Sequence, residues 1–117
     1  MGAPVVHFEI VHPEADRLRG FYADVFDWEI DTDNPMDYGM VDNKGEGING
    51  GIGPAPDPDY PGHVTFYVAV SDPQATLDRV AELGGETVMP PTEVPGGDLI
   101  IAMFKDPSGN LIGLAKA

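Results

Sequence analysis

The chain has 117 residues and no cysteine, and its 20 Asp and Glu against 6 Lys and Arg give a formal net charge of −14. A chain of this length makes one domain, and the lack of cysteine excludes disulfides and thiolate chemistry. The negative charge disfavours nucleic acid and anionic lipid as partners, since both are bound through cationic side chains.

No apolar run approaches the roughly 18 residues that span a bilayer. No basic segment followed by an apolar one begins the chain, so the sequence shows no secretory signal. We therefore expect a cytoplasmic protein with no membrane partner. The acidic residues are spread along the chain, which indicates either a solvated surface or adaptation to a high-salt cytoplasm.

Alternation predicts a first strand over residues 5–11, with His7 and Glu9 on one face and an all-apolar set on the other. A helix is expected to begin at Pro13. Its apolar stripe has helical spacing and consists of Leu18, Phe21, Tyr22 and Val25. Gly20 suggests close packing of this helix on a sheet. Short strands are then predicted over 28–30, 38–41 and 48–53.

Four prolines in residues 54–62 indicate a stiff linker. The order of elements then begins again, with a strand over 63–70. Asp72 and Pro73 form the start of a second helix, which Gly84-Gly85 ends. A strand over 86–88, a loop over 90–97 and an antiparallel hairpin over 99–114 complete the chain.

The two halves therefore share one order, strand–helix–three strands, which predicts an α+β fold built from a repeat. A shift of 58 residues lays Tyr22 on Val80 and Ile30 on Val88, whereas a shift of 60 lays Pro13 on Pro73. Both shifts are even, so either one preserves which face of a strand each residue occupies.

Five stretches match the pattern of a known family, and they are His7-Phe8-Glu9-Ile10, Phe21 to Trp28, Tyr67 to Asp72, Leu83-Gly84-Gly85, and Phe104 to Leu114. Through them the chain resembles the vicinal oxygen chelate superfamily of glyoxalase I, bleomycin-resistance proteins and extradiol dioxygenases. The resemblance implies a single domain over 1–117, made of two βαβββ modules, 4–53 and 63–117, joined by the linker 54–62. The modules would form a cup-shaped mixed sheet with helices outside and small-molecule chemistry inside.

The active enzymes of this family hold a divalent metal in the cup, with His or Gln on the first strand of each module and Glu on the last. His7 matches the first of these positions. The equivalent residue of the second half is Thr65, or His63 after a slip of two. The positions of the carboxylates fall on Gly113 and on residues 49–51, which carry no carboxylate. One histidine cannot hold a metal that needs three or four converging donors.

Alternation predicts the residues that line the cup, namely His7, Glu9, Asn49, Gly51, Thr65, Tyr67, Met103 and Gly113. His7 and Glu9 are the candidates for an acid–base pair, although His7 could also be a lining histidine bonded to Glu9 or to water. His12 is expected to be exposed, and His63 to lie at the frayed end of its strand. Phe26 and Trp28 are expected in the core or at a dimer contact.

Two functions remain open at this point. The first is a bleomycin-resistance-like protein that binds a small organic ligand in a metal-free cup. The second is a glyoxalase- or dioxygenase-like enzyme that uses a divalent metal and an unusual ligand set. The resemblance also implies a homodimer.

Overall fold

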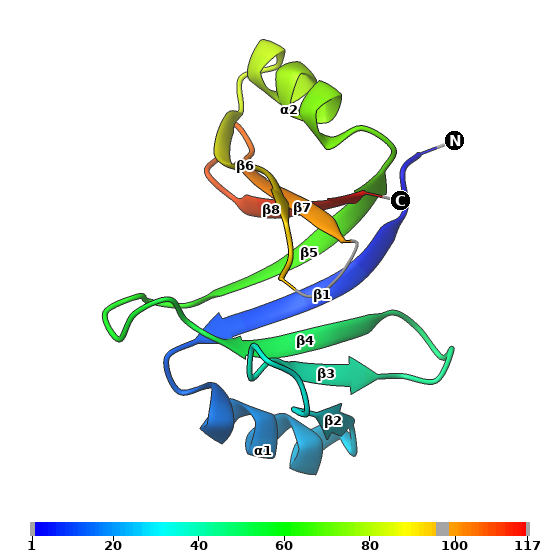
Figure 1. Cartoon of the computed structure of the whole chain (residues 1–117), viewed down its shortest axis with the longest axis vertical. Coiled ribbons are helices and arrows are strands. Elements are labelled where there is room, and N and C mark those ends of the chain that lie inside the picture. The colour runs from blue at the N-terminus through cyan, green and yellow to red at the C-terminus, as the bar shows by residue number, and fades with distance from the viewer. Residues whose placement is uncertain (1, 96–98, 117) are drawn as a thin grey trace. The chain divides into compact units, whose positions relative to one another are not determined.

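The computed structural model describes residues 2–95 and 99–116 and has the expected mixed α+β fold (Figure 1). Its elements in chain order are β1 (Val5–His12), α1 (Ala15–Phe26), β2 (Glu29–Asp31), β3 (Gly39–Asp42), β4 (Asn49–Pro54), β5 (His63–Val70), α2 (Pro73–Glu82), β6 (Glu86–Glu93), β7 (Ile100–Lys105) and β8 (Leu111–Lys116). They fall into two compact units. The first unit is His7–Val64, and the second unit combines Met1–Val6 with Thr65–Ala117.

Both units have the same strand order. In the first unit the order is β2-β3-β4-β1, with β1 parallel to β4 and the other pairs antiparallel. In the second unit the order is β5-β8-β7-β6, with β5 parallel to β8 and the other pairs antiparallel. The repeated βαβββ pattern predicted from the sequence is therefore confirmed.

The second unit follows its sequence signals closely. The Asp72 side chain caps α2 by accepting the Ala75 N–H at 3.1 Å, and Pro73 occupies the first helical turn. Leu77 on the inner face of α2 packs with Ala102 and Leu114, and all three side chains are 2% exposed or less. This cluster is the core of the unit.

The predicted hairpin of β7 and β8 forms around Asp106. Its carboxylate accepts the N–H groups of Ser108 and Asn110 at 3.0 and 2.9 Å, and Gly109 takes the left-handed conformation with φ 89°. Strand β6, in contrast, runs through Pro90 and Pro91, where the sequence predicted a loop. It lies at the edge of the sheet and its register shifts twice against β7, and proline is tolerated at edges and bulges. The remainder of the predicted loop includes residues 96 and 97, which lie outside the described residues.

Helix α1 departs from prediction at both its start and its buried face. It begins at Ala15, not Pro13, and the Glu14 N–H before it is bonded to His12 Nδ1 at 3.0 Å. The side chains it buries are Ala15 and Arg19, whereas Phe21 and Val25 of the predicted stripe are more than half exposed. His12 is half-buried, where exposure was expected.

Arg19 explains why the buried face of α1 differs from the predicted one. It lies five residues after the N-cap of α1, as Leu77 does in α2, so an arginine takes the place that a core leucine has in the other unit. Its guanidinium donates to the carbonyls of Asp37 and Ile52 at 3.3 and 3.4 Å and pairs with Asp16. The helix therefore turns its arginine inward because backbone carbonyls are there to receive it.

Gly20 does not serve the close packing expected of it. It is exposed, and a β-carbon built on it would meet no atom within 4 Å. No helix in the described part of the chain is both long and apolar enough to cross a membrane.

Candidate functional site

The candidate site is built on β1 of the first unit. The register of β1 against β4 pairs His7 with Asn49 and Glu9 with Gly51, so the alternation predicted for these four residues is observed. The half-buried side chains of His7 and Glu9 lie two residues apart on one face.

The Glu9 carboxylate is the centre of a hydrogen-bonded network. Tyr38 Oη donates to Glu9 Oε2 at 3.0 Å, and His63 Nε2 lies 3.0 Å from Glu9 Oε1. His7 Nε2 lies 2.9 Å from Tyr38 Oη, and Tyr60 Oη lies 2.7 Å from His63 Nδ1. We call these five residues the Glu9 network, and all of them belong to the first unit.

The directions of these bonds follow from the number of protons available. The single phenolic proton of Tyr38 goes to Glu9, so His7 must donate its Nε2–H to the Tyr38 oxygen. An ionised carboxylate only accepts, so His63 donates its Nε2–H to Glu9. When His63 is neutral, its Nδ1 accepts the proton of Tyr60. Each hydrogen bond of the network is therefore donated either to Glu9 itself or to a residue that donates to Glu9.

His63 was expected at a frayed strand end, and the structure corrects this. It is the first residue of β5, but its side chain is only 16% exposed and is held by Glu9 and Tyr60. Tyr60 lies near the end of the proline-rich stretch, so its bond to His63 and the bond of His63 to Glu9 connect that end to β1. The pair of His63 and Glu9 becomes a salt bridge whenever His63 is protonated.

Burial sets the charge of His7. Loss of solvent lowers the pKa of His7 below its ordinary value, and the nearby Glu9 carboxylate opposes this shift in part. The lowered pKa favours the neutral form of the His7 imidazole. It is then a group that can accept a proton.

Two members of the network, Tyr60 and Tyr38, were not predicted from the sequence, and Tyr38 joins His7 to Glu9. Asn34 fixes the backbone of Tyr38, since Asn34 Oδ1 accepts the Tyr38 N–H at 2.9 Å and Asn34 Nδ2 donates to the Tyr38 carbonyl at 2.6 Å. Arg19 binds the preceding carbonyl, that of Asp37. The sequence predicted a strand over 38–41, but β3 begins at Gly39, so Tyr38 belongs to the preceding loop. Alternation along strands cannot place a loop side chain.

The glycines of β4 make room for this tyrosine. A β-carbon on Gly51 would lie about 2 Å from the Tyr38 ring, and one on Gly53 would lie 2.5 Å from it. On the opposite face, a β-carbon on Gly50 would lie 2.2 Å from the ring of Phe8. The glycines of β4 therefore leave space for two aromatic rings, one on each face of the strand. These glycines are the sequence signal that could have indicated the position of Tyr38.

In the second unit, a glycine again leaves space for a tyrosine ring. Tyr67 pairs with Gly113 across β5 and β8, and a β-carbon on Gly113 would lie 2.4 Å from the Tyr67 ring. Met103 pairs with the same glycine from β7. The side chains of Thr65, Tyr67 and Met103 are at most 9% exposed, and Thr65 Oγ1 donates to the Leu111 carbonyl at 2.5 Å.

Asn49 is exposed, and its side chain contributes to a turn. Its Oδ1 accepts the Asn43 N–H at 2.8 Å, which closes the connection between β3 and β4. Trp28 and Phe26 contact one another at 5.1 Å between ring centroids, and Phe26 is 56% exposed.

The residues present do not fit the metal site of the resembled family. The resemblance implies carboxylates within residues 49–51 and at residue 113, but these residues are Asn49, Gly50, Gly51 and Gly113. Tyrosine rings fill the side-chain space at Gly51 and at Gly113. Among residues 2–95 and 99–116, no group of three or more His, Cys, Asp and Glu is placed to hold a metal ion. Because a stable site needs several converging donors, we derive no chemistry through a metal.

Comparison with known proteins agrees with the resemblance read from the sequence. The family model of the Glyoxalase/Bleomycin resistance protein/Dioxygenase superfamily matches residues 5–114. The chain is 33% identical over 113 residues to "Putative glyoxylase CFP32" of Mycobacterium tuberculosis and of Mycobacterium bovis, an alignment that covers 89% of this chain. It spans only 42% of the length of these relatives.

Solved structures share the fold at low sequence identity. A superfamily member from Vibrio splendidus is 16% identical with a TM-score of 0.68, covering 99% of this chain and all of that one. Methylmalonyl-CoA epimerase from Mycobacterium tuberculosis is 16% identical with a TM-score of 0.69, covering 96% and 86% of the two chains. A hypothetical protein from Bacillus halodurans is 13% identical with a TM-score of 0.72, covering 100% and 96%.

Proposed function

The chain belongs to the Glyoxalase/Bleomycin resistance protein/Dioxygenase superfamily, and from this premise we propose that it binds a small organic molecule without a metal ion. The Glu9 network supplies the polar contacts in this proposal. A few converging polar groups on rigid elements are what orients a small ligand. The observation that carries the proposal is the contact of Tyr38 with Gly51, because its phenol fills side-chain space on the segment, residues 49–51, where the resemblance implies a carboxylate.

The network suits binding because its polarity is already organised. Its hydrogen bonds link three separate segments, β1, the loop that carries Tyr38 and the start of β5. A ligand group that replaces one of these bonds meets donors and acceptors in fixed positions, so little conformational entropy is lost on binding.

The test is a thermal-shift screen with small organic molecules in the presence of EDTA. Bleomycin and methylmalonyl-CoA are the first probes, because the names of the family and of its structural neighbours supply them. Any compound that raises the melting temperature is then titrated by calorimetry against the native protein and Tyr38→Phe. The proposal expects binding that persists in EDTA and weakens in the variant. Binding that requires an added divalent metal would overturn it, as would a screen without a single binder.

A second candidate is metal-free acid–base catalysis, which the neutral state of His7 favours. A neutral imidazole beside a hydrogen-bonded phenol and carboxylate can take a proton from a carbon acid and return it. One structural neighbour is an epimerase that acts on an acyl-CoA. Methylmalonyl-CoA in D₂O is therefore the probe, and deuterium incorporation at the carbon between its carbonyls is the readout. Exchange that matches the protein-free rate, or that survives both His7→Asn and Glu9→Gln, excludes this candidate.

A homodimer and a cytoplasmic location stay proposals that rest on family membership and on the sequence. Sedimentation velocity gives the mass of the particle in solution, and a mass of one chain would exclude the dimer. Imaging of a tagged chain in its native cell tests the location.

A further inference from the structure

The C-terminal half of α1 carries apolar side chains that the fold leaves uncovered. Phe21, Val25 and Phe26 are 55%, 54% and 56% exposed. Phe21 and Val25 are four residues apart, so they are neighbours on one side of the helix. Tyr22 and Trp28 support them, with ring centroids 5.0 Å from Phe21 and 5.1 Å from Phe26 respectively. We call Phe21, Val25 and Phe26 the α1 face.

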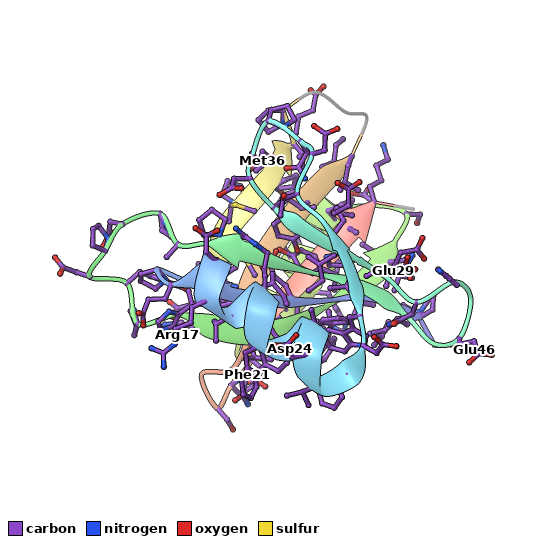
Figure 2. All side chains as sticks on the ribbon, turned by 90° about the horizontal axis from the view of Figure 1, so that it is seen from below. Arg17, Phe21, Asp24, Glu29, Met36 and Glu46 are labelled. Atoms are coloured by element: carbon purple, nitrogen blue, oxygen red, sulfur yellow. The ribbon has the colours of Figure 1, made fainter. Side chains whose placement is uncertain are left out.

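The charged residues in the C-terminal half of α1 are acidic. Asp24 lies beside Phe21 and Val25, Asp27 follows as the C-cap, and both are exposed. Figure 2, which looks onto α1, shows Asp24 and Phe21 on this helix and Arg17 nearer its start. The last turn of α1 contains no basic residue, whereas the last turn of α2 contains Arg79.

The helix itself adds to this negative potential. The last carbonyls of an α-helix carry the negative end of its dipole, where cations are stabilising and anions are not. Arg17 and Arg19 do not compensate it, because they lie in the first half of α1 and pair with Glu14 and Asp16. The C-terminal half of α1 thus combines exposed aromatic rings with a negative electrostatic potential that a cation would offset.

We propose that the α1 face binds a basic amphipathic segment of another protein, one that presents leucine-like side chains together with Lys or Arg. The apolar residues of the partner would cover Phe21 and Val25, and its cations would meet Asp24 and Asp27. A second copy docked by the same face is a poor occupant, because it would set its own Asp24 and Asp27 against those of the first copy. The same aspartates repel anionic lipid.

The probe is a synthetic amphipathic helix of about 18 residues, with leucines on one face and Lys and Arg on the other. A scrambled peptide of the same composition and a peptide with Glu in place of the cations are its controls. Amide chemical shifts of the full-length, ¹⁵N-labelled protein locate the contact, and fluorescence anisotropy gives the affinity. The proposal expects shifts concentrated in residues 20–28, and an affinity at least about tenfold above that of both control peptides.

Variants separate this site from general attraction to an acidic protein. Phe21→Ser should lower the affinity about tenfold, while Leu83→Ser, at an exposed leucine following α2, should leave it unchanged. Asp24→Asn with Asp27→Asn should weaken binding further and flatten its salt dependence, whereas Asp78→Asn on α2 should do neither. All of these positions are exposed, so the variants should remain folded, which circular dichroism checks.

Three results would overturn the proposal. Shifts spread evenly over the acidic surface would show attraction without a site. Equal losses of peptide affinity in Phe21→Ser and Leu83→Ser would also show attraction without a site. If the protein alone forms a concentration-dependent dimer that Phe21→Ser abolishes, the occupant of the α1 face is a second copy.

Discussion

The ring of Tyr38 lies on Gly51, so close that a β-carbon at that position would fall about 2 Å from the ring atoms. This contact connects a glycine of β4 to the hydroxyl that joins His7 to Glu9. Residue 51 therefore has to lack a side chain, because the Tyr38 ring occupies the space that a side chain would fill.

The contact predicts strong coupling between the two positions. Gly51→Ala should lower the free energy of unfolding by about 1–3 kcal/mol, because overpacking forces a shift of the ring or the strand. In a Tyr38→Ser background the same substitution should cost far less. Urea unfolding of the four proteins in this cycle measures the coupling, and additive effects would contradict the contact.

Removing the central acceptor should disrupt the Glu9 network more than removing one link. In Glu9→Gln, the new amide NH₂ must face either the His63 N–H or the Tyr38 O–H, and donors then oppose each other. We expect a loss of about 1–3 kcal/mol for this variant, and less for Tyr38→Phe, which leaves the bond between His63 and Glu9 intact. Chemical denaturation of both variants makes the comparison, and the reverse order would show that Glu9 is not the hub.

The pH dependence of stability should show the lowered pKa of His7. A histidine whose pKa is lower in the folded state binds its proton less tightly there than when unfolded. Its contribution is therefore complete above about pH 6.5 and declines as the pH falls below that value. The native protein should lose more stability between pH 7.5 and pH 5 than His7→Asn does, since His12 and His63 are present in both. A steeper loss in the variant would mean that the pKa of His7 is raised.

Gly20 offers a stabilising substitution. It lies within α1, is exposed, and has open space where a β-carbon would go. Gly20→Ala should raise the stability by about 0.5–1 kcal/mol, because alanine loses less conformational freedom in a helix. Thermal unfolding checks it, and destabilisation would indicate that the helix needs the glycine.

The second unit could be predicted from the sequence almost residue by residue. Its helix has a capping aspartate and a proline in the first turn, and its hairpin has a turn organised by Asp106. These are local signals, and the side chains that give them act on backbone groups only a few residues away. The exception is β6, where tertiary pairing with β7 extended a strand through two prolines.

The first unit was harder to predict because its determinants are not local. Arg19 is buried against carbonyls that belong to residues 37 and 52, and no pattern within α1 reveals them. The site was predicted in part for a similar reason. Alternation placed His7 and Glu9 on one face, but the residues that connect them to their surroundings, Tyr38 and His63, come from a loop and a strand end far along the chain.

We propose that this member of the superfamily binds its ligand without a metal ion. Elemental analysis of tag-free protein, purified and then incubated with zinc, manganese, iron or nickel before exhaustive dialysis, is the decisive measurement, with His7→Asn as the control. We expect no metal in a constant ratio to the protein and no difference between the two proteins. One equivalent of a divalent metal per chain that is lost in His7→Asn would overturn the proposal.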